Sequence, residues 1–143
     1  MYTERFSEAH APLGKYGSAS FNSEQNIGWI DMAKYHRIAV VCHAILVGTS
    51  LDIDIEIATD DNGSKIHTLK SLTQLSGSDD GDLVVIEIRA EELGKPTGAP
   101  ASNYSHVRVE ITPSGTTAAS IIVYGIEPRY APIDSTLWSA ITP

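Results

Sequence analysis

The sequence predicts an all-β fold, an antiparallel two-sheet sandwich or barrel of about eight short strands. Residues 106–112 alternate between polar and aliphatic side chains, as the residues of a half-buried strand do. Residues 120–127 are rich in β-branched side chains and apolar on both faces, which favours a central strand. Turn residues recur roughly every ten positions, a spacing typical of sandwiches and barrels.

The chain has 143 residues, enough for one domain with one hydrophobic core. We expect a single β-sandwich domain over residues 1–143, with an extended arm at residues 1–15 and a tail at residues 131–143. The only cysteine, Cys42, lies inside an apolar run, which predicts a buried free thiol and excludes an internal disulfide.

The first half of the chain is predicted to form three strands. Residues 16–21 are a short edge strand, and residues 26–31 lead into one helical turn that Asp31 caps. Residues 36–47 are the longest apolar run, and their β-branched content favours a strand, although two alanines leave a helix open.

The middle of the chain begins with the most regular strand, residues 51–57, in which aliphatic residues alternate with acids. Turn residues at 60–63 predict a hairpin. Residues 65–75 combine a three-residue apolar spacing with polar alternation, and we favour an irregular strand over a helix. Residues 83–89 form a strand that ends in a helical turn at residues 90–93, and a Gly, Pro and Ala loop follows at residues 94–102.

The last two strands, at residues 106–112 and 120–127, are joined by a turn at residues 113–115. We expect them to pair as an antiparallel hairpin, with the second strand covered on both faces. The predicted core includes the aliphatic residues of the alternating strands, Leu51, Ile53, Ile55, Ile57, Val107, Val109 and Ile111. The predicted wet or intersubunit faces carry the intervening residues, Asp52, Asp54, Glu56, Arg108 and Glu110.

Two acidic loops, residues 60–63 and 79–82, are possible calcium sites, but neither has the ligand spacing of an EF-hand and turn chemistry explains both. The acids of residues 52–56 are spaced like a glycosidase pair, yet a solvated sheet face explains them more simply. Cys42 and His43 point to opposite faces of a strand, so they cannot form a thiolate–imidazole pair.

The sequence has no nucleophile elbow, phosphate-binding loop, metal-spaced Cys/His set or dinucleotide glycine pattern. We therefore expect no enzymatic activity, no metal and no cofactor. The formal net charge of −8 opposes binding to nucleic acid. No apolar stretch approaches the roughly 20 residues that span a bilayer, so we expect no membrane insertion.

Three stretches carry a resemblance to a known group of proteins: Arg89-Ala90-Glu91-Glu92-Leu93, the run from Tyr104 to Thr112, and Pro128-Arg129-Tyr130-Ala131-Pro132. Residues 30–35 and 72–75 contribute to the same likeness. With these stretches the sequence resembles small structural proteins of tailed bacteriophage heads. The resemblance implies a jelly-roll decoration, or cement, protein that binds the major capsid protein lattice on the capsid surface of the virion, often as a homotrimer, after assembly in the host cytoplasm.

The tail carries apolar side chains in a segment too short for its own core, so we expect it to bind a partner surface. The predicted interface residues are Leu137, Trp138, Ile141, Tyr130, Arg129 and Phe6. The alternative function is a carbohydrate-binding or fibre-type β-sandwich module of a virion, in which Trp29, Trp138 and the tyrosines stack on sugar rings. An enzyme that uses the acidic face is a third possibility.

Overall fold

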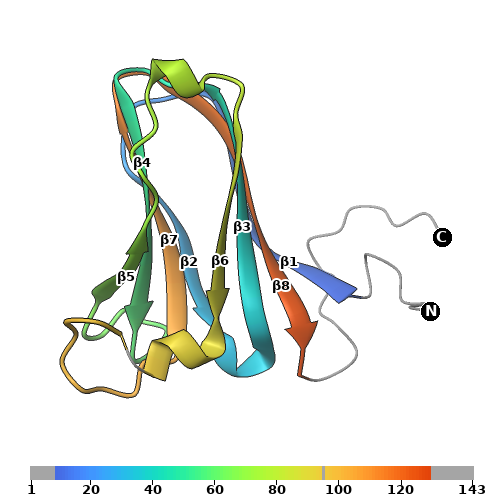
Figure 1. The fold of residues 1–143 in the computed structure, drawn as a ribbon, viewed down its shortest axis with the longest axis vertical. Coiled ribbons are helices and arrows are strands. Elements are labelled where there is room, and N and C mark those ends of the chain that lie inside the picture. The colour runs from blue at the N-terminus through green and yellow to red at the C-terminus, as the bar shows by residue number, and fades with distance from the viewer. Residues whose placement is uncertain (1–8, 95, 130–143) are drawn as a thin grey trace.

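The computed structural model describes residues 9–94 and 96–129, which form eight strands and three short 3-10 helices (Figure 1). The strands are β1 (His10–Phe21), β2 (Gln25–Asp31), β3 (Tyr35–Leu46), β4 (Ser50–Ala58), β5 (His67–Ser71), β6 (Leu83–Arg89), β7 (His106–Ser114) and β8 (Thr117–Pro128). The 3-10 helices are η1 (Met32–Lys34), η2 (Gly77–Asp79) and η3 (Ala90–Gly94). Within these residues, no helix has both the length and the apolar character to cross a membrane.

The strands form two four-stranded antiparallel sheets that pack face to face (Figure 1). Sheet A has the order β1-β8-β3-β6 and sheet B the order β2-β7-β4-β5. Successive strands alternate between the two sheets, except that β4 and β5 are neighbours in sheet B. This strand order is that of a jelly roll. The predicted antiparallel sandwich is therefore confirmed.

The core between the sheets contains the aliphatic residues that the alternation predicts. All seven are 0% exposed: Leu51, Ile53, Ile55, Ile57, Val107, Val109 and Ile111. Sheet A adds Ile38, Ile88 and Ile121, which are also fully buried. Each such side chain contributes about 1.5–3 kcal/mol to folding relative to exposure. This layer holds the two sheets together and fixes which residues face outward.

Most local predictions are confirmed. The carboxylate of Asp31 caps η1 by accepting a hydrogen bond from the Ala33 amide at 2.9 Å. Residues 36–47 form a strand rather than a helix, β4 and β5 form a hairpin, and the strand at residues 83–89 has the predicted bounds. The ambiguous segment at residues 65–75 contains only the short strand β5.

The predicted hairpin between the last two strands is wrong. β7 belongs to sheet B and β8 to sheet A, although only Gly115 and Thr116 separate them. A two-residue connection normally joins paired strands, but here Gly115, at φ +80°, turns the chain from one sheet to the other. The β3–β4 connection packs against this turn, because a Cβ on Gly48 would lie 2.8 Å from backbone atoms of Gly115 and Thr116. Packing between two connections thus overrides the local signal.

The N-terminal edge strand is longer than predicted, because β1 begins at His10 and residues 10–15 pair with β8 instead of forming an irregular arm. Pro12 is tolerated there because β1 is an edge strand. The register shifts between Pro12 and Gly14, where the chain passes close to Ile27 of β2. These irregularities hide the strand from a pattern search.

β8 is a central strand, as predicted, but the described residues cover only one of its faces. Ala119, Ile121 and Val123 point into the core and are at most 1% exposed. The alternate residues face outward and are only half-buried, namely Ile122, Tyr124 and Ile126. The expectation that both faces of β8 are covered is therefore not met within residues 9–94 and 96–129. The described residues leave the outer face of this strand partly exposed.

Candidate interaction surface

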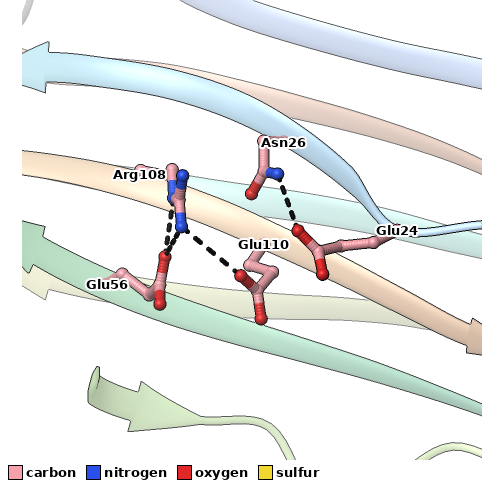
Figure 2. A network of polar contacts seen from close by, with 5 residues as sticks. All are labelled: Glu24, Asn26, Glu56, Arg108 and Glu110. Carbon is pink, nitrogen blue, oxygen red and sulfur yellow. Dashed lines mark hydrogen bonds and ion pairs between the residues drawn. The ribbon is translucent and has the colours of Figure 1, made fainter. Parts of the chain in front are cut away.

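The outer faces of the two sheets differ in chemistry. The face of sheet B is polar, and Arg108 of β7 lies at its centre (Figure 2). Its Nε and Nη2 atoms donate to Oε2 of Glu56 on β4 at 2.6 and 2.5 Å, and Nη2 lies 3.4 Å from Oε2 of Glu110. Figure 2 shows Glu24 and Asn26 beside this group, joined by a hydrogen bond of 3.0 Å.

One residue of this predicted solvent-facing surface is buried. Glu56 is only 9% exposed, so its assignment to a wet face is corrected: the Arg108 guanidinium closes over it. Burial, followed by the charge of Glu56, raises the pKa of Glu110 above its ordinary value, while Arg108 opposes the shift. One cation thus holds two carboxylates that would otherwise repel each other. The arrangement is that of a structural ion pair.

Trp29 belongs to the same polar face and is half-buried. The guanidinium carbon of Arg108 lies 4.9 Å from the centre of its ring, a cation–π distance. A Cβ on Gly63 would lie 2.9 Å from the ring, so the β4–β5 turn packs against the tryptophan as well. These contacts occupy ring surface that a sugar would need, so the geometry of Trp29 does not favour the carbohydrate-binding alternative.

The acidic loops use their carboxylates in turns, as predicted. Asp60 accepts hydrogen bonds from the amides of Asn62 and Ser64 at 3.1 and 2.9 Å, and its pKa is lowered first by the side chain of Ser64 and then by these amides. In the second loop the carboxylate of Asp79 accepts a hydrogen bond from the Ser76 amide at 2.7 Å. The carboxylate of Asp80 accepts one from the Val47 amide, also at 2.7 Å. In the described part of the chain, no group of three His, Cys, Asp or Glu residues is arranged to hold a metal ion.

Cys42 is 1% exposed and burial raises the pKa of its thiol to about 11. His43 is exposed on the opposite face of β3. The predicted buried thiol and the geometric separation of the two residues are both confirmed. A thiol so protonated and enclosed is chemically inert.

The outer face of sheet A carries aligned apolar side chains from three adjacent strands. Val41 of β3 is in register with Ile122 of β8 on one side and with Val85 of β6 on the other. The next outward row places Ala39 between Tyr124 and Glu87, and the row on the other side of Val41 places His43 between Ser120 and Leu83. Because the intervening residues point into the core, these rows lie on one surface, apolar along the row of Val41 and flanked by His43 and Glu87, which we call the apolar face.

The apolar face becomes more exposed toward the edge strand β6. Leu83 is 68% exposed and Val85 is 54% exposed. Ile45 and Leu46, at the end of the neighbouring β3, are 48% and 49% exposed. Exposed apolar side chains gathered in one patch are typical of an interaction site, whereas isolated ones need no explanation. The sequence indicated this face through β8, because the residues on both sides of that strand are apolar.

A pocket of about 360 Å³ lies at one end of the same face, where β3, β6 and β8 meet. Its lining contains His36 and Arg37 of β3, Arg89 of β6, Ala90 and Glu91 of η3, and Glu127 and Arg129 at the end of β8. Arg37 stands directly opposite Arg89 in the strand register. We call this site the arginine pocket. Sequence reasoning missed it because its cations come from three separate segments.

Of the predicted interface residues, Arg129 lies in the arginine pocket. Leu137, Trp138, Ile141, Tyr130 and Phe6 lie outside the described residues. Their predicted role in an interface therefore stays a prediction. β1 begins and β8 ends side by side, with His10 paired to Ile126 (Figure 1).

No family model and no curated protein matches this sequence. Among solved structures, the chain is similar to one in the structure of infectious bursal disease virus, Gx strain, with 17% sequence identity and a TM-score of 0.34. The match covers 84% of this chain and 31% of that chain, so this chain spans less than a third of the length of the chain it matches. A TM-score this low assigns neither a family nor a function.

Proposed function

We propose that the chain is a structural protein of a virus particle, a decoration protein that binds the outer surface of a capsid lattice and stabilises it. The observation that carries the proposal is the apolar face of sheet A, on which Ile122, Val41 and Val85 align across three strands. The opposite face of the sandwich is polar, and Arg108 there forms ion pairs with Glu56 and Glu110. The molecule therefore has one face suited to a protein partner and one suited to water.

Two further points support this role. The jelly-roll arrangement is used by viral capsid domains, although lectins and other proteins share it, so the fold alone assigns no function. The resemblance to structural proteins of phage heads involves residues 89–93 and 104–112. The first of these segments forms the end of β6 and η3, at the edge of the apolar face.

Association follows from the free energy of the exposed side chains. Leu83 and Val85 are more than half exposed, and covering each of them is worth about 1–2 kcal/mol of apolar transfer free energy. β6 is also an edge strand, and Lys70 and Glu92 bond its backbone only at the Glu87 carbonyl and the Arg89 amide, so Leu83 and Val85 lie on the part of the edge nearer its start. We propose that the apolar face contacts neighbouring subunits, both copies of this chain, as a homotrimer, and the coat protein. No catalytic activity or cofactor is part of this role.

The test replaces both side chains by threonine, which is nearly isosteric with valine and has a high strand preference at both positions. Leu83→Thr/Val85→Thr should leave the melting temperature nearly unchanged, because both residues are exposed. Because threonine keeps part of the apolar area, the loss should be about 1.4–2.8 kcal/mol, which weakens association about 10- to 100-fold. Light scattering measures the oligomer, and co-sedimentation with capsids assembled without this protein measures attachment.

Ile66→Thr is the matched control, because Ile66 is 46% exposed and precedes β5 on the other sheet. It should assemble and bind capsids like the parent chain. If the double variant assembles and binds capsids as tightly as this control does, the apolar face is not the contact surface. Tight binding to a polysaccharide together with no binding to capsids would favour the carbohydrate-binding module instead.

A further inference from the structure

The arginine pocket concentrates positive charge in a protein whose formal net charge is −8. Its three arginines outnumber its two glutamates, which leaves a formal charge of +1. Like charges placed directly opposite each other across two strands are destabilising, and Arg37 and Arg89 are so placed. An anion between the two guanidinium groups would remove this repulsion.

The carboxylates already in the pocket do not satisfy its cations. Nη2 of Arg37 lies 3.2 Å from Oε1 of Glu127, while the Nε atom of Arg37 is buried and finds no hydrogen-bond partner among residues 9–94 and 96–129. Nη1 of Arg89 lies 3.6 Å from Oε1 of Glu91, and both side chains are more than two-thirds exposed, so this pair is weak. The weakly paired guanidinium of Arg89 is therefore the donor group that an oxyanion can reach, whereas the Nε atom of Arg37 is enclosed by the protein.

We propose that the arginine pocket binds one carboxylate, contributed by an acidic side chain of a neighbouring protein subunit. A guanidinium presents a planar fork of N–H donors that matches a carboxylate, and two opposed guanidinium groups can hold both of its oxygens. A pocket of about 360 Å³ admits an acidic side chain. The protein's overall negative charge opposes a polyanion such as nucleic acid, whereas a single carboxylate meets mainly the local positive charge.

The position of the pocket identifies the source of the carboxylate. Arg37, Ala39 and Val41 are alternate residues of β3, so Arg37 lies on the same outer face as the apolar rows, about 13 Å from Val41 along the strand. A subunit that covers the apolar face therefore also covers the pocket. This part of the inference rests on the proposed function. The site would supply specificity and register, as charged groups at the rim of an apolar contact do.

The test begins with the isolated protein and small probes. N-acetylglutamate amide carries one side-chain carboxylate and no other charge, and N-acetylglutamine amide is its neutral match. Nuclear magnetic resonance of the Arg37 Nε–H group should show a saturable shift with the glutamate probe. The glutamine probe and chloride at equal ionic strength should produce no saturable shift. A tighter response to inorganic phosphate than to the glutamate probe would overturn the assignment to a carboxylate.

Arg89→Gln is the decisive variant, because its side chain is 67% exposed and its loss should not disturb the fold. It leaves Arg37 in place as the reporter and should weaken binding of the glutamate probe about tenfold. Lys65→Gln removes the same charge from the loop before β5 and should bind the probe like the parent chain. Equal binding by Arg89→Gln and Lys65→Gln would overturn the proposal.

Assembly assays separate this inference from the proposed function. Arg89→Gln should weaken self-association or capsid attachment severalfold, while Lys65→Gln should not. If Arg89→Gln assembles and attaches normally and only Leu83→Thr/Val85→Thr fails, the pocket does not receive a subunit's carboxylate, yet the apolar face keeps its role. If Leu83→Thr/Val85→Thr assembles and attaches normally, the apolar face loses its role, and the probe titration still decides whether the pocket binds a carboxylate.

Discussion

Replacement of Arg108 by methionine should show how much the cation on the polar face of sheet B contributes to the free energy of unfolding. Methionine keeps an unbranched apolar stem of the same type but removes the guanidinium that binds Glu56 and Glu110. Two neighbouring carboxylates are then left without their cation, and Glu56 has a side chain only 11% exposed. Removing one partner of a fully buried pair costs about 3–5 kcal/mol.

The expected cost for Arg108→Met is smaller, about 2–3 kcal/mol, because the arginine side chain keeps 21% of its exposure and water screens the remaining charges. This figure includes the lost cation–π contact with Trp29, worth about 0.5–1 kcal/mol. For a chain of this size, the loss corresponds to a decrease in melting temperature of about 5–10 °C. Urea unfolding followed by circular dichroism measures the free energy of unfolding directly.

The double variant Arg108→Met/Glu56→Gln provides the internal control. It removes the stranded charge as well as its partner, so it should be about 1–2 kcal/mol more stable than Arg108→Met alone. If Arg108→Met unfolds within about 0.5 kcal/mol of the parent chain, the ion pair contributes little and the reasoning fails. A double variant as unstable as the single one would show that lost packing, rather than uncompensated charge, sets the cost.

Two further predictions concern single groups. The pKa of Glu110 is raised in the folded state. The folded protein therefore binds a proton at Glu110 more tightly than the unfolded chain does. As a result, the free energy of unfolding falls as the pH rises through the ordinary glutamate pKa of about 4.3 and above. Glu110→Gln should therefore unfold at a higher temperature than the parent at pH 7 and at nearly the same temperature at pH 3; a lower melting temperature at pH 7 would mean that the contact with Arg108 outweighs burial. Cys42, buried and with its pKa raised to about 11, should react with a thiol reagent at pH 8 only in denaturant; rapid labelling of the native protein would contradict its placement in the core.

The two candidate sites differed in how visible they are in the sequence. The apolar character of both sides of residues 120–127 indicates that two surfaces are to be covered, but not that one of them lies outside the domain. The arginine pocket gives no sequence signal, because Arg37 and Arg89 are far apart in the chain and only the β3–β6 register makes them neighbours. The predicted interface residues of the tail lie outside the described part of the chain.

The sequence by itself determined the fold class, most strand positions and the inward-facing residues of β4 and β7, because alternation with a period of two is a local property of a strand. It also determined the turn chemistry at Asp31 and Asp60, where a side chain bonds to its own neighbours. Only the tertiary structure decided that β7 and β8 lie in different sheets, because the turn at Gly115 is fixed by packing against the connection at Gly48. It alone decided that Glu56 is buried, since the covering group, Arg108, comes from another strand, and burial depends on contacts that no local pattern encodes.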